Sequence, residues 1–599
     1  LQTPSQLHDA ILTMDKFSNS LPVAIASIGS SKITLLVGSA ITVGADATIP
    51  DNIILWFVGP GKLFVNSGKV LTINSPSQVL AHTQQQVFDG TGTVSFTNGG
   101  IVSPGWWGFS SGGTAAANAD AYNACTASLT ATGGAIVIPP TGAAHQVDDT
   151  LTHPAKPMSV IGAHPELSII ESTATASLKH GLTFTRSHHV RNLTIKTSAS
   201  LASNYDMYGV RMDLDGVTVS GGNQAVKWES VKVRGFNNSF YCDGGDAYNV
   251  DRLYFNDLDA QCSGPASTYI GSCLYINRVT QVYGTHSQFD QNSTGEHAIY
   301  CFGSKNLVFD GFKIRNFDKG TAQAIKVVGN GVAPDDDQAY PTWSIRNMDI
   351  ADGLNGILCG IYGTETLEAI TVENCKFVDV DTSAAILGCV YLSAAGTSNI
   401  RTLRVSGIST RNCLYQGVHV ATGASATMGP VSIRDCKGYN WSTTSAGTYT
   451  WFGTSGTGTF GPITLEGIEA DGNSKGRTIL SSSGQASTIS RIRYSGLKEV
   501  NTTNMGRPIS LPEADATPSL AIGNWFVQPN TGAQNITAYD NLEANQTYYI
   551  RFSTANTTLI DGANLQLAGS TNYNPPANTF MTFYCSDGTA LYEVSRSVN

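Results

Sequence analysis

A short strand-like segment recurs along the middle of the chain. In residues 367–377, LEAITVENCKF, Ile370 and Val372 alternate with Thr371 and Glu373, which is the period-two pattern of a half-buried β-strand. Similar segments follow one another at intervals of 25 to 36 residues, and each ends in a polar or glycine turn. The residues expected to point outward from them are Thr194, Lys227, Tyr254, Tyr283, Val308, Ser344, Thr371, Arg404, Ser432, Thr464 and Arg493. A unit this small cannot bury its own apolar face, so stacked units must share one core.

The interval between the segments predicts an all-β solenoid, a parallel β-helix with three strands in each turn. It is too short for the four-stranded blade of a propeller. A second strand precedes most copies, for example at 210–212, 274–276 and 390–392. Only 13% of the residues are charged and 62 are glycine, a composition typical of a turn-rich β chain.

The charge and the cysteine content narrow the class of function. A net charge of -10 argues against a nucleic-acid surface, and no apolar run is long enough for membrane insertion. The eleven cysteines lack metal-ligand spacing, so we expect buried thiols and no metal site. No dinucleotide fingerprint or phosphate-binding loop appears in a fitting context, so we expect no cofactor.

Four regions are expected along the chain. Residues 1–110 predict an entry helix at 5–17 and then a small domain of short β-strands. Residues 111–503 form the solenoid, which begins with a capping helix. Residues 504–519 have the composition of a linker. Residues 520–599 return to short strands and predict a β-sandwich-like module that covers the open end of the solenoid.

Several stretches resemble a known family. Residues 120–147, DAYNACTASLTATGGAIVIPPTGAAHQV, and 159–172, SVIGAHPELSIIES, look like the capping helix and first coils of pectate-lyase-like right-handed β-helices. Residues 48–73, TIPDNIILWFVGPGKLFVNSGKVLTI, and 102–109, VSPGWWGF, resemble the domain that bacteriophage tailspikes place before such a helix. The region from residue 520 onward resembles their C-terminal module. The chain is thus similar to tailspike depolymerases of podoviruses that infect Acinetobacter.

The resemblance implies a right-handed parallel β-helix that assembles as a homotrimer and is carried on the virion. The protein would be made in the host cytoplasm and act at the exterior of the host cell. A segment preceding Leu1 would attach it to the phage tail. Its partner would be a bacterial capsular polysaccharide or exopolysaccharide. No catalytic motif carries over residue by residue, because tailspikes place their catalytic acids at different positions.

The strand that precedes each repeat supplies a column of outward side chains. Residues in register on stacked strands lie about 4.8 Å apart, so their side chains form a ladder. The ladder runs Arg211, Tyr241, Tyr275, Tyr300, Lys326, Leu358, Tyr391 and His419, and Tyr362 lies beside it. Aromatic rings among cationic side chains predict a groove that binds an extended polysaccharide. The alternative is that tyrosine favours strands and stacks on its neighbours.

Hydrolysis of a glycosidic bond needs two carboxyl groups beside the ladder. Glu365 is the first candidate, because the turn GIYGTET lies at the edge of the ladder. Asp336, in a long loop with three consecutive aspartates, would reach across to complete the pair. Glu296, just before a strand, is a second candidate, and Asp243 with its register neighbour Asp213 is a third. For these acids the alternative is a solvated turn or loop.

The sequence therefore predicts a phage tailspike that recognises and hydrolyses a bacterial capsular polysaccharide or exopolysaccharide during host adsorption. One alternative is a polysaccharide lyase on the same fold, which would leave an unsaturated product. Another is a non-catalytic adhesin that binds the glycan in the same groove.

Overall fold

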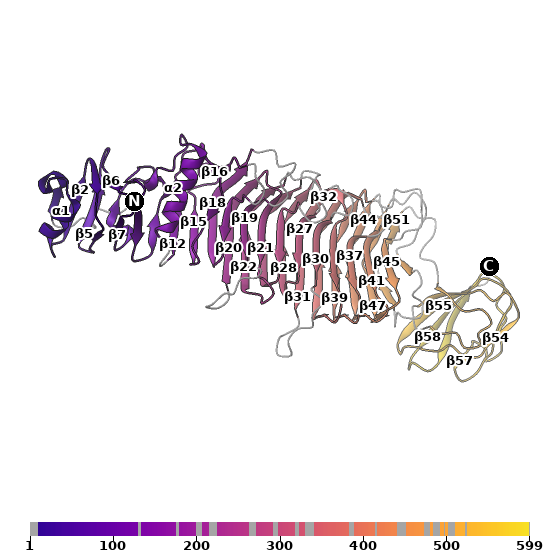
Figure 1. Cartoon of the computed structure of the whole chain (residues 1–599). Helices are drawn as coiled ribbons and strands as arrows, with labels where there is room; N and C mark the ends of the chain where they lie inside the picture. The colour runs from indigo at the N-terminus through magenta and orange to yellow at the C-terminus, as the bar shows by residue number, and fades with distance from the viewer. Residues whose placement is uncertain are drawn as a thin grey trace. The chain divides into compact units, whose positions relative to one another are not determined.

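The repeated segments are β-strands that pair in parallel with the corresponding strands of the next repeat (Figure 1). In the computed structural model, β35 (Ala369–Glu373) pairs with β39 (Leu403–Ser406). Ile370 and Val372 are buried, whereas Thr371 and Glu373 are half-buried. The fold is therefore an all-β parallel β-helix, as the repeat predicts.

The structure describes most of the chain, in two compact units. The first unit is Leu1–Val327 with Met348–Leu354, and the second is Val328–Asn347 with Asn355–Asn599. The described residues are 10–129, 133–174, 179–198, 207–214, 224–262, 271–291, 297–317, 323–329, 341–381, 388–413, 416–439, 451–471, 480–482, 492–495, 498–500, 509–520 and 524–597.

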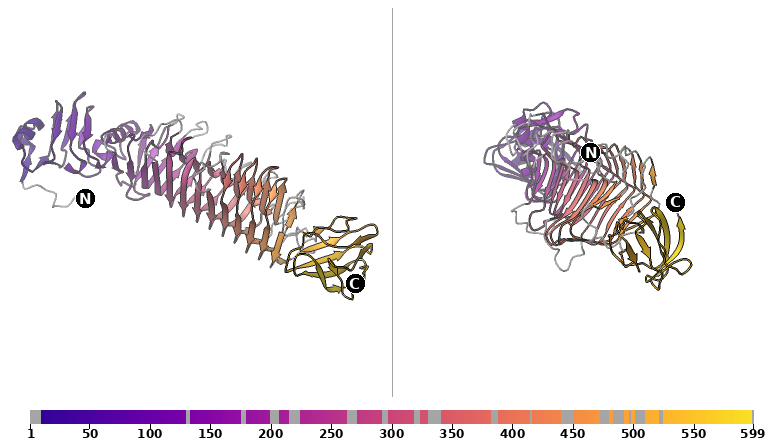
Figure 2. Two further views of the ribbon diagram at one scale, coloured as in Figure 1. Left: turned by 90° about the horizontal axis from the view of Figure 1, so that it is seen from below. Right: turned by 90° about the vertical axis from the view of Figure 1, so that its right-hand side faces the viewer.

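Each turn of the first unit gives strands to two sheets, and Figure 2 shows them stacked as successive rungs. What we call the ladder sheet contains β17 (Leu182–Phe184), β19 (Tyr208–Asp213), β21 (Asn238–Asp243), β24 (Leu274–Asn277), β27 (His297–Phe302) and β30 (Gln323–Val328). What we call the bent sheet contains β18 (His188–Thr197), β20 (Gln224–Arg234), β22 (Val250–Asn256), β23 (Asp259–Gln261), β25 (Val279–Thr285), β26 (Gln288–Asp290), β28 (Asn306–Asp310) and β29 (Lys313–Arg315).

The polar or glycine turn of each repeat is the corner of the bent sheet. At Asn374, for example, φ is 53°, in the left-handed region that only glycine and short polar residues adopt at low cost. The corner residues with positive φ are Asn192, Ser230, Asp257, His286, Gly311, Asn347, Asn374, Gly407, Asp435 and Gly467. The sequence pattern thus encodes the position at which each rung turns.

The register of the outward column is as predicted except at its first member. Lys227 pairs with Tyr254, Tyr254 with Tyr283, and Thr371 with Arg404. Thr194, however, pairs with Lys232 on the other half of the bent sheet. The residue in register with Lys227 is His189. Strand β18 bends at Asn192 and contributes to both halves, so its alternating pattern occurs twice.

Inward side chains of successive rungs form a continuous apolar core. Val210, Phe240, Leu274 and Ile299 lie in register on neighbouring strands of the ladder sheet and are fully buried. Burying such a side chain stabilises a fold by about 1.5–3 kcal/mol. None of the eleven cysteines forms a disulfide and all are buried, so they pack as small apolar residues, as expected.

The expected helix at 5–17 is not present in the part of that range that the structure describes. Ala10–Thr13 form strand β1, which pairs in parallel with β2 (Ile33–Val37), and Met14–Phe17 form a 3-10 turn. Pairing with β2 satisfies the backbone groups of β1, and this outweighs the local helical pattern. The nearest helix is α1 (Leu21–Ile28).

The small β-domain that follows is itself coiled. Its strands form three short parallel sheets, ordered β1-β2-β5-β8, β3-β6-β9 and β10-β7-β4. Their bounds are β3 (Ala40–Val43), β4 (Ala47–Ile49), β5 (Ile53–Phe57), β6 (Lys62–Val65), β7 (Val70–Ile73), β8 (Val79–Leu80), β9 (Phe88–Asp89) and β10 (Thr93–Phe96). Helix α2 (Ala115–Ala127), capped by Thr114, then packs on β13 (Ala144–Val147), as the capping helix was expected to do.

The second unit continues the same design and adds a short third sheet. Its ladder-sheet strands are β33 (Ile357–Ile361), β37 (Gly388–Ala394), β41 (Gln416–Thr422), β45 (Phe452–Gly456) and β49 (Leu480–Ser482). The third sheet consists of β34 (Thr366–Leu367), β38 (Asn399–Ile400), β42 (Thr427–Met428) and β46 (Thr459–Phe460).

The C-terminal residues form a separate β-module with its own core. β55 (Gln546–Phe552) pairs in parallel with β53 (Trp525–Gln528) and antiparallel with β58 (Thr579–Cys585). The segment expected as a linker, 504–519, is part of this module from residue 509 onward. There β52 (Ile509–Ser510) pairs with β53, and Leu511 is buried in the core. Its polar and proline-rich composition concealed this apolar anchor.

Candidate functional site

The ladder sheet of the first unit brings its outward residues into the predicted register. Arg211 pairs with Tyr241, Tyr241 with Tyr275, and Tyr275 with Tyr300. The next strand of the sheet, β30, carries Lys326. All five side chains are half-buried, so they line the outer surface without being fully solvated.

The tyrosine rings form a continuous stack. The ring centroids of Tyr208 and Tyr241 are 4.7 Å apart, those of Tyr241 and Tyr275 are 5.0 Å apart, and those of Tyr275 and Tyr300 are 5.2 Å apart. The imidazole of His297 stacks on Tyr300 at 5.4 Å. Tyr241 and Tyr275 are stacked face to face at 11°, and the other two pairs are tilted at 54° and 38°, so the tyrosines form a row of closely spaced rings and hydroxyl groups. Such a row suits hydrogen bonding to a polyhydroxylated chain.

A cation lies toward each end of this stack. The guanidinium carbon of Arg211 is 5.5 Å from the ring centre of Tyr208 and 5.9 Å from that of Tyr241. At the other end, the Lys326 amine is 5.2 Å from the ring centre of Tyr300. It is also 3.4 Å from Nε2 of His297. Cation–π contacts of this kind hold the charges close to the row of hydroxyl groups.

Two aspartates lie in register beside the stack, in unlike environments. Asp213 forms an ion pair with Arg211 on its own strand. Its register neighbour Asp243 is only 4% exposed and accepts hydrogen bonds from Gly245 N at 2.8 Å and Asn277 Nδ2 at 2.8 Å. Burial raises the pKa of the Asp243 carboxyl, and the negative charge of Asp213 raises it further.

The histidines next to the stack are held neutral. Burial, reinforced by the positive charge of Arg211, lowers the pKa of His180 to about 4. Burial and Lys326 also lower the pKa of His297. Near pH 7 these rings therefore act as neutral polar groups rather than as anion-binding cations.

In the second unit, fewer large side chains point outward from the ladder sheet, and the residues of the adjacent column are small. Leu358 pairs with Tyr391, and Tyr391 with His419, whose rings stack at 5.4 Å. Burial lowers the pKa of His419 to about 4. Its ring nitrogens lie 2.6 Å from Gln416 Oε1 and 2.7 Å from Ser455 Oγ.

Tyr362 lies beside this column, as predicted. It is 44% exposed, and its hydroxyl group lies 3.2 Å from the point where a side chain at Gly360 would begin. Gly360 is in register with Ser393, and Ser393 with Ala421. The phenol of Tyr362 thus occupies space left by small residues.

Glu365 is not a solvated turn residue, which was the alternative to a catalytic role. It is only 6% exposed. A Cβ atom at Gly329 would overlap its carboxylate, so the carboxylate packs directly against the backbone at 329. Position 329 is two and four residues from the core residues Val327 and Ile325, so by the alternation of a strand it faces the same side as they do. This packing favours a structural role for Glu365, and its catalytic role stays a prediction.

The other two predicted acids lie outside the described residues. Asp336 falls in the segment 330–340, and Glu296 falls in 292–296. Of the four predicted catalytic acids, the structure therefore brings only Asp243 together with a second carboxylate, Asp213, on the ladder surface that it describes.

Sequence reasoning missed two residues of the cluster. Tyr208 has the same parity as the core residues Val210 and Met212, so the alternating pattern assigns it to the interior. His180 precedes its strand by two residues and lies 3.4 Å from a guanidinium nitrogen of Arg211. The one available signal for Tyr208 was that an aromatic residue begins the strand, two residues before Val210.

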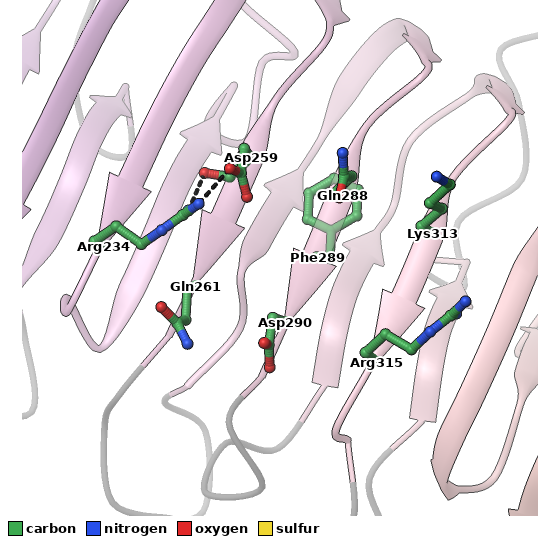
Figure 3. Close-up of a pocket in the computed structure, with 8 residues that line it drawn as sticks. All are labelled: Arg234, Asp259, Gln261, Gln288, Phe289, Asp290, Lys313 and Arg315. Atoms are coloured by element: carbon green, nitrogen blue, oxygen red, sulfur yellow. Dashed lines mark hydrogen bonds and ion pairs between the residues drawn. The ribbon is translucent and has the colours of Figure 1, made fainter. Parts of the chain in front are cut away.

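A polar hollow of about 230 Å³ lies on the bent sheet of the first unit (Figure 3). Arg234 is bound to the carboxylate and the carbonyl oxygen of Asp259 on the next rung. Arg315 makes the same pair of contacts with Asp349 on β32 (Asp349–Leu354). The motifs VKVRGF and FKIRNF supply both arginines. We assign these arginines a structural role in joining rungs, since their charges are already paired.

The described residues contain neither a metal-binding cluster nor a membrane-spanning helix. No cluster of three or more histidine, cysteine, aspartate or glutamate side chains among them is arranged to hold a metal ion. Among the same residues, no helix is both long and apolar enough to span a bilayer.

No protein-family model and no curated protein sequence matches this chain. Among solved structures it is similar to the catalytic unit of a GH87 alpha-1,3-glucanase from Streptomyces thermodiastaticus, at 12% identity and a TM-score of 0.37. That match covers 68% of this chain and 70% of the glucanase. It is also similar to the tailspike of Acinetobacter phage vB_ApiP_P1, at 13% identity and a TM-score of 0.29, covering 83% of this chain and 79% of that one.

A third similar structure is the A-module of a mannuronan C-5 epimerase from Azotobacter vinelandii, at 11% identity and a TM-score of 0.29. The match covers 66% of this chain and 98% of the module. At these identities and TM-scores, the neighbours carry no conclusion about activity or substrate.

Proposed function

We propose that the protein binds a bacterial surface polysaccharide along the ladder sheet of its first unit and hydrolyses it, as a homotrimeric phage tailspike. The observation that carries the proposal is the pair Asp213 and Asp243. They are register neighbours in unlike environments, and they lie beside a row of tyrosine hydroxyl groups. The phage assignment and the trimer rest on the resemblance in sequence.

The two carboxyl groups suit the two roles of glycoside hydrolysis. Burial raises the pKa of Asp243 and so favours its protonated form, and this carboxyl group is assigned the role of the acid that donates a proton to the glycosidic oxygen of the leaving sugar. Asp213, which forms an ion pair with Arg211, attacks the anomeric carbon and forms a glycosyl ester. Water then releases the sugar, with Asp243 acting as base. Register neighbours start about 4.8 Å apart, close to the separation of about 5–5.5 Å in retaining enzymes.

The test is cleavage of a panel of purified capsular polysaccharides, followed by size-exclusion chromatography. Asp243→Asn and Asp213→Asn should each lower the rate at least about 10³-fold, because each removes a group that takes part in bond cleavage. Asp310→Asn, on the bent sheet, is the matched control and should cleave like the wild type. NMR of the first product should show retention of anomeric configuration.

Other outcomes would assign the protein to a different class. Wild-type rates in both aspartate variants would remove this pair as the catalytic acids. Products that absorb ultraviolet light as unsaturated uronates would show a lyase. A polysaccharide that is retained by the protein but never shortened would show an adhesin.

A further inference from the structure

A second hollow, of about 440 Å³, lies on the half of the bent sheet that precedes its corner. It is lined by the strands β12 (Gly134–Val137), β15 (Met158–Ile161), β18, β20 and β22. Its lining includes the small residues Gly134, Ser159, Ser187 and Ala225. This surface belongs to a different sheet from the tyrosine stack, and the proposed cleavage does not use it.

The register explains why the surface is hollow there. One outward column runs Ser159, His189, Lys227 and Tyr254 on successive rungs, so the side chains grow longer along it. In the adjacent column, Ala225 is followed by Arg252. Small residues thus form a depression, and Tyr254 with Arg252 forms a wall at one end.

Tyr254 presents an aromatic face to this depression. Its ring stacks on Tyr283 of the following rung, with centroids 5.1 Å apart and an interplanar angle of 20°. Tyr283 covers the face on that side, and the opposite face is directed toward the rung of Lys227, where the hollow lies. Tyr254 is 48% exposed. In the tyrosine stack of the ladder sheet, by contrast, Tyr241 and Tyr275 each have a neighbouring ring on both sides, within 4.7 to 5.2 Å between centroids.

The polar groups around the hollow are fixed and their charges are balanced. Glu229 contacts His189 Nε2 at 2.6 Å and Lys227 Nζ at 2.9 Å. Arg252 contacts Asp251 at 3.1 Å. A hollow with paired charges, several polar groups and one exposed aromatic ring suits a neutral, hydroxyl-rich ligand better than an anion.

We propose that this hollow is a non-catalytic carbohydrate subsite that takes one pyranose ring stacked on Tyr254. None of the described residues that line it carries a carboxylate, and glycoside hydrolysis needs two. The subsite deepens the proposed function and rests on it for the identity of its ligand, a sugar unit of the bacterial surface polysaccharide. Binding at a second surface would keep the protein on its polymer between cleavage events.

The experiment measures binding to an array of immobilised bacterial capsular polysaccharides and lipopolysaccharides. The Asp243→Asn chain serves as the parent, so that cleavage does not remove the probe. Adding Tyr254→Ala should weaken retention about tenfold through loss of the stacking face. Adding Tyr254→Phe should preserve it, because the ring remains. Tyr439→Ala, which removes an exposed tyrosine of the second unit, is the matched control and should not change retention.

The outcomes separate this inference from the proposed function. If the wild-type chain cleaves the polysaccharide but Tyr254→Ala does not change retention, the subsite is overturned and the hydrolase proposal stands. Retention that depends on Tyr254 without any cleavage would support the subsite and overturn the hydrolase. Light scattering would also show whether Tyr254→Ala changes the oligomeric state. If it does and retention is unchanged, a second copy of the chain covers this surface. That result would also overturn the subsite.

Discussion

The ladder sheet has the same backbone design in both units, but its outward side chains differ. In the first unit the column carries tyrosines on three successive rungs, with Arg211 and Lys326 toward its ends and two aspartates beside it. In the second unit it carries Leu358, Tyr391 and His419 beside small residues. A parallel β-helix therefore holds its register whatever the outward residues are, and chemistry is decided column by column.

The two units should also differ in their response to acid, and this is the largest effect we expect. Ten of the eleven histidines precede residue 300. Burial lowers the pKa of His153 to about 4 and that of His188 to about 3. Trp228 Nε1 donates to His188 Nε2 at 2.9 Å, so protonation of that nitrogen would break the bond.

Both folded pKa values lie below the ordinary value of 6.5, so the fold favours the neutral rings. Their contribution to stability is complete above pH 6.5 and is lost as the pH falls toward 4 and 3. At pH 4, each of these two histidines should lower the free energy of unfolding by on the order of 3 kcal/mol relative to neutral pH. Hydrogen exchange followed by mass spectrometry should show the rungs around β18, near both His153 and His188, losing protection before those around β41, which carries one such histidine, His419. His188→Gln should reduce this acid sensitivity, and equal loss in both units would contradict it.

Cleavage should depend on the acids of the first unit. Asp243→Asn should lower the rate about 10³-fold, whereas Glu365→Gln should change it less than about threefold. Asp243 lies beside the tyrosine hydroxyl groups, and Glu365 is packed against Gly329. Rates of polymer shortening measured under identical conditions make the comparison. The reverse pattern would return catalysis to Glu365, the acid that the sequence ranks first.

The features of the fold that can be predicted from the sequence are those that follow from its periodicity. Strand type, parallel pairing and the register of Tyr241, Tyr275 and Tyr300 follow from the alternation of apolar residues, because a shift by one residue would expose the core. The corner residues follow as well, since few residue types tolerate positive φ. Thr194 was assigned to the wrong half of the bent sheet because β18 carries the alternating pattern on both sides of its corner.

The chemistry of individual acids could not be predicted in the same way. Whether Glu365 is solvated depends on the absence of a side chain at Gly329, which is 36 residues away in sequence. The raised pKa of Asp243 depends on burial and on Asp213, which is 30 residues away. The alternation of residues identifies Asp213 as the register neighbour of Asp243, but it does not determine how deeply each carboxyl group is buried between neighbouring rungs.

The packing of Glu365 gives a smaller, structural test of the second unit. Gly329→Ala should lower the free energy of unfolding by about 1–3 kcal/mol, because the new methyl group would overlap the buried carboxylate. Thermal unfolding of the purified protein measures the loss. Gly562→Ala is the control, because no atom lies within 4 Å of the added methyl group.

A double-mutant cycle then identifies the cause of that loss. In a Glu365→Ala background, Gly329→Ala should cost much less, since the overlapping group is gone. If Gly329→Ala lowers the free energy of unfolding equally in the two backgrounds, the backbone at 329, rather than the carboxylate, is what disfavours the substitution.

The smallest expected effect concerns the tyrosine hydroxyl groups themselves. Tyr275→Phe keeps the ring stack and removes one hydroxyl group from the middle of the row, so any change in binding reports on that hydroxyl group. In the Asp243→Asn parent, affinity for an oligosaccharide product should fall about three- to tenfold, as expected for one lost hydrogen bond. Tyr391→Phe in the second unit should leave affinity unchanged in the same titration. Equal losses in the two variants would mean that the shorter ladder binds sugar as strongly as the longer one, and that the contrast between the two columns has no counterpart in binding.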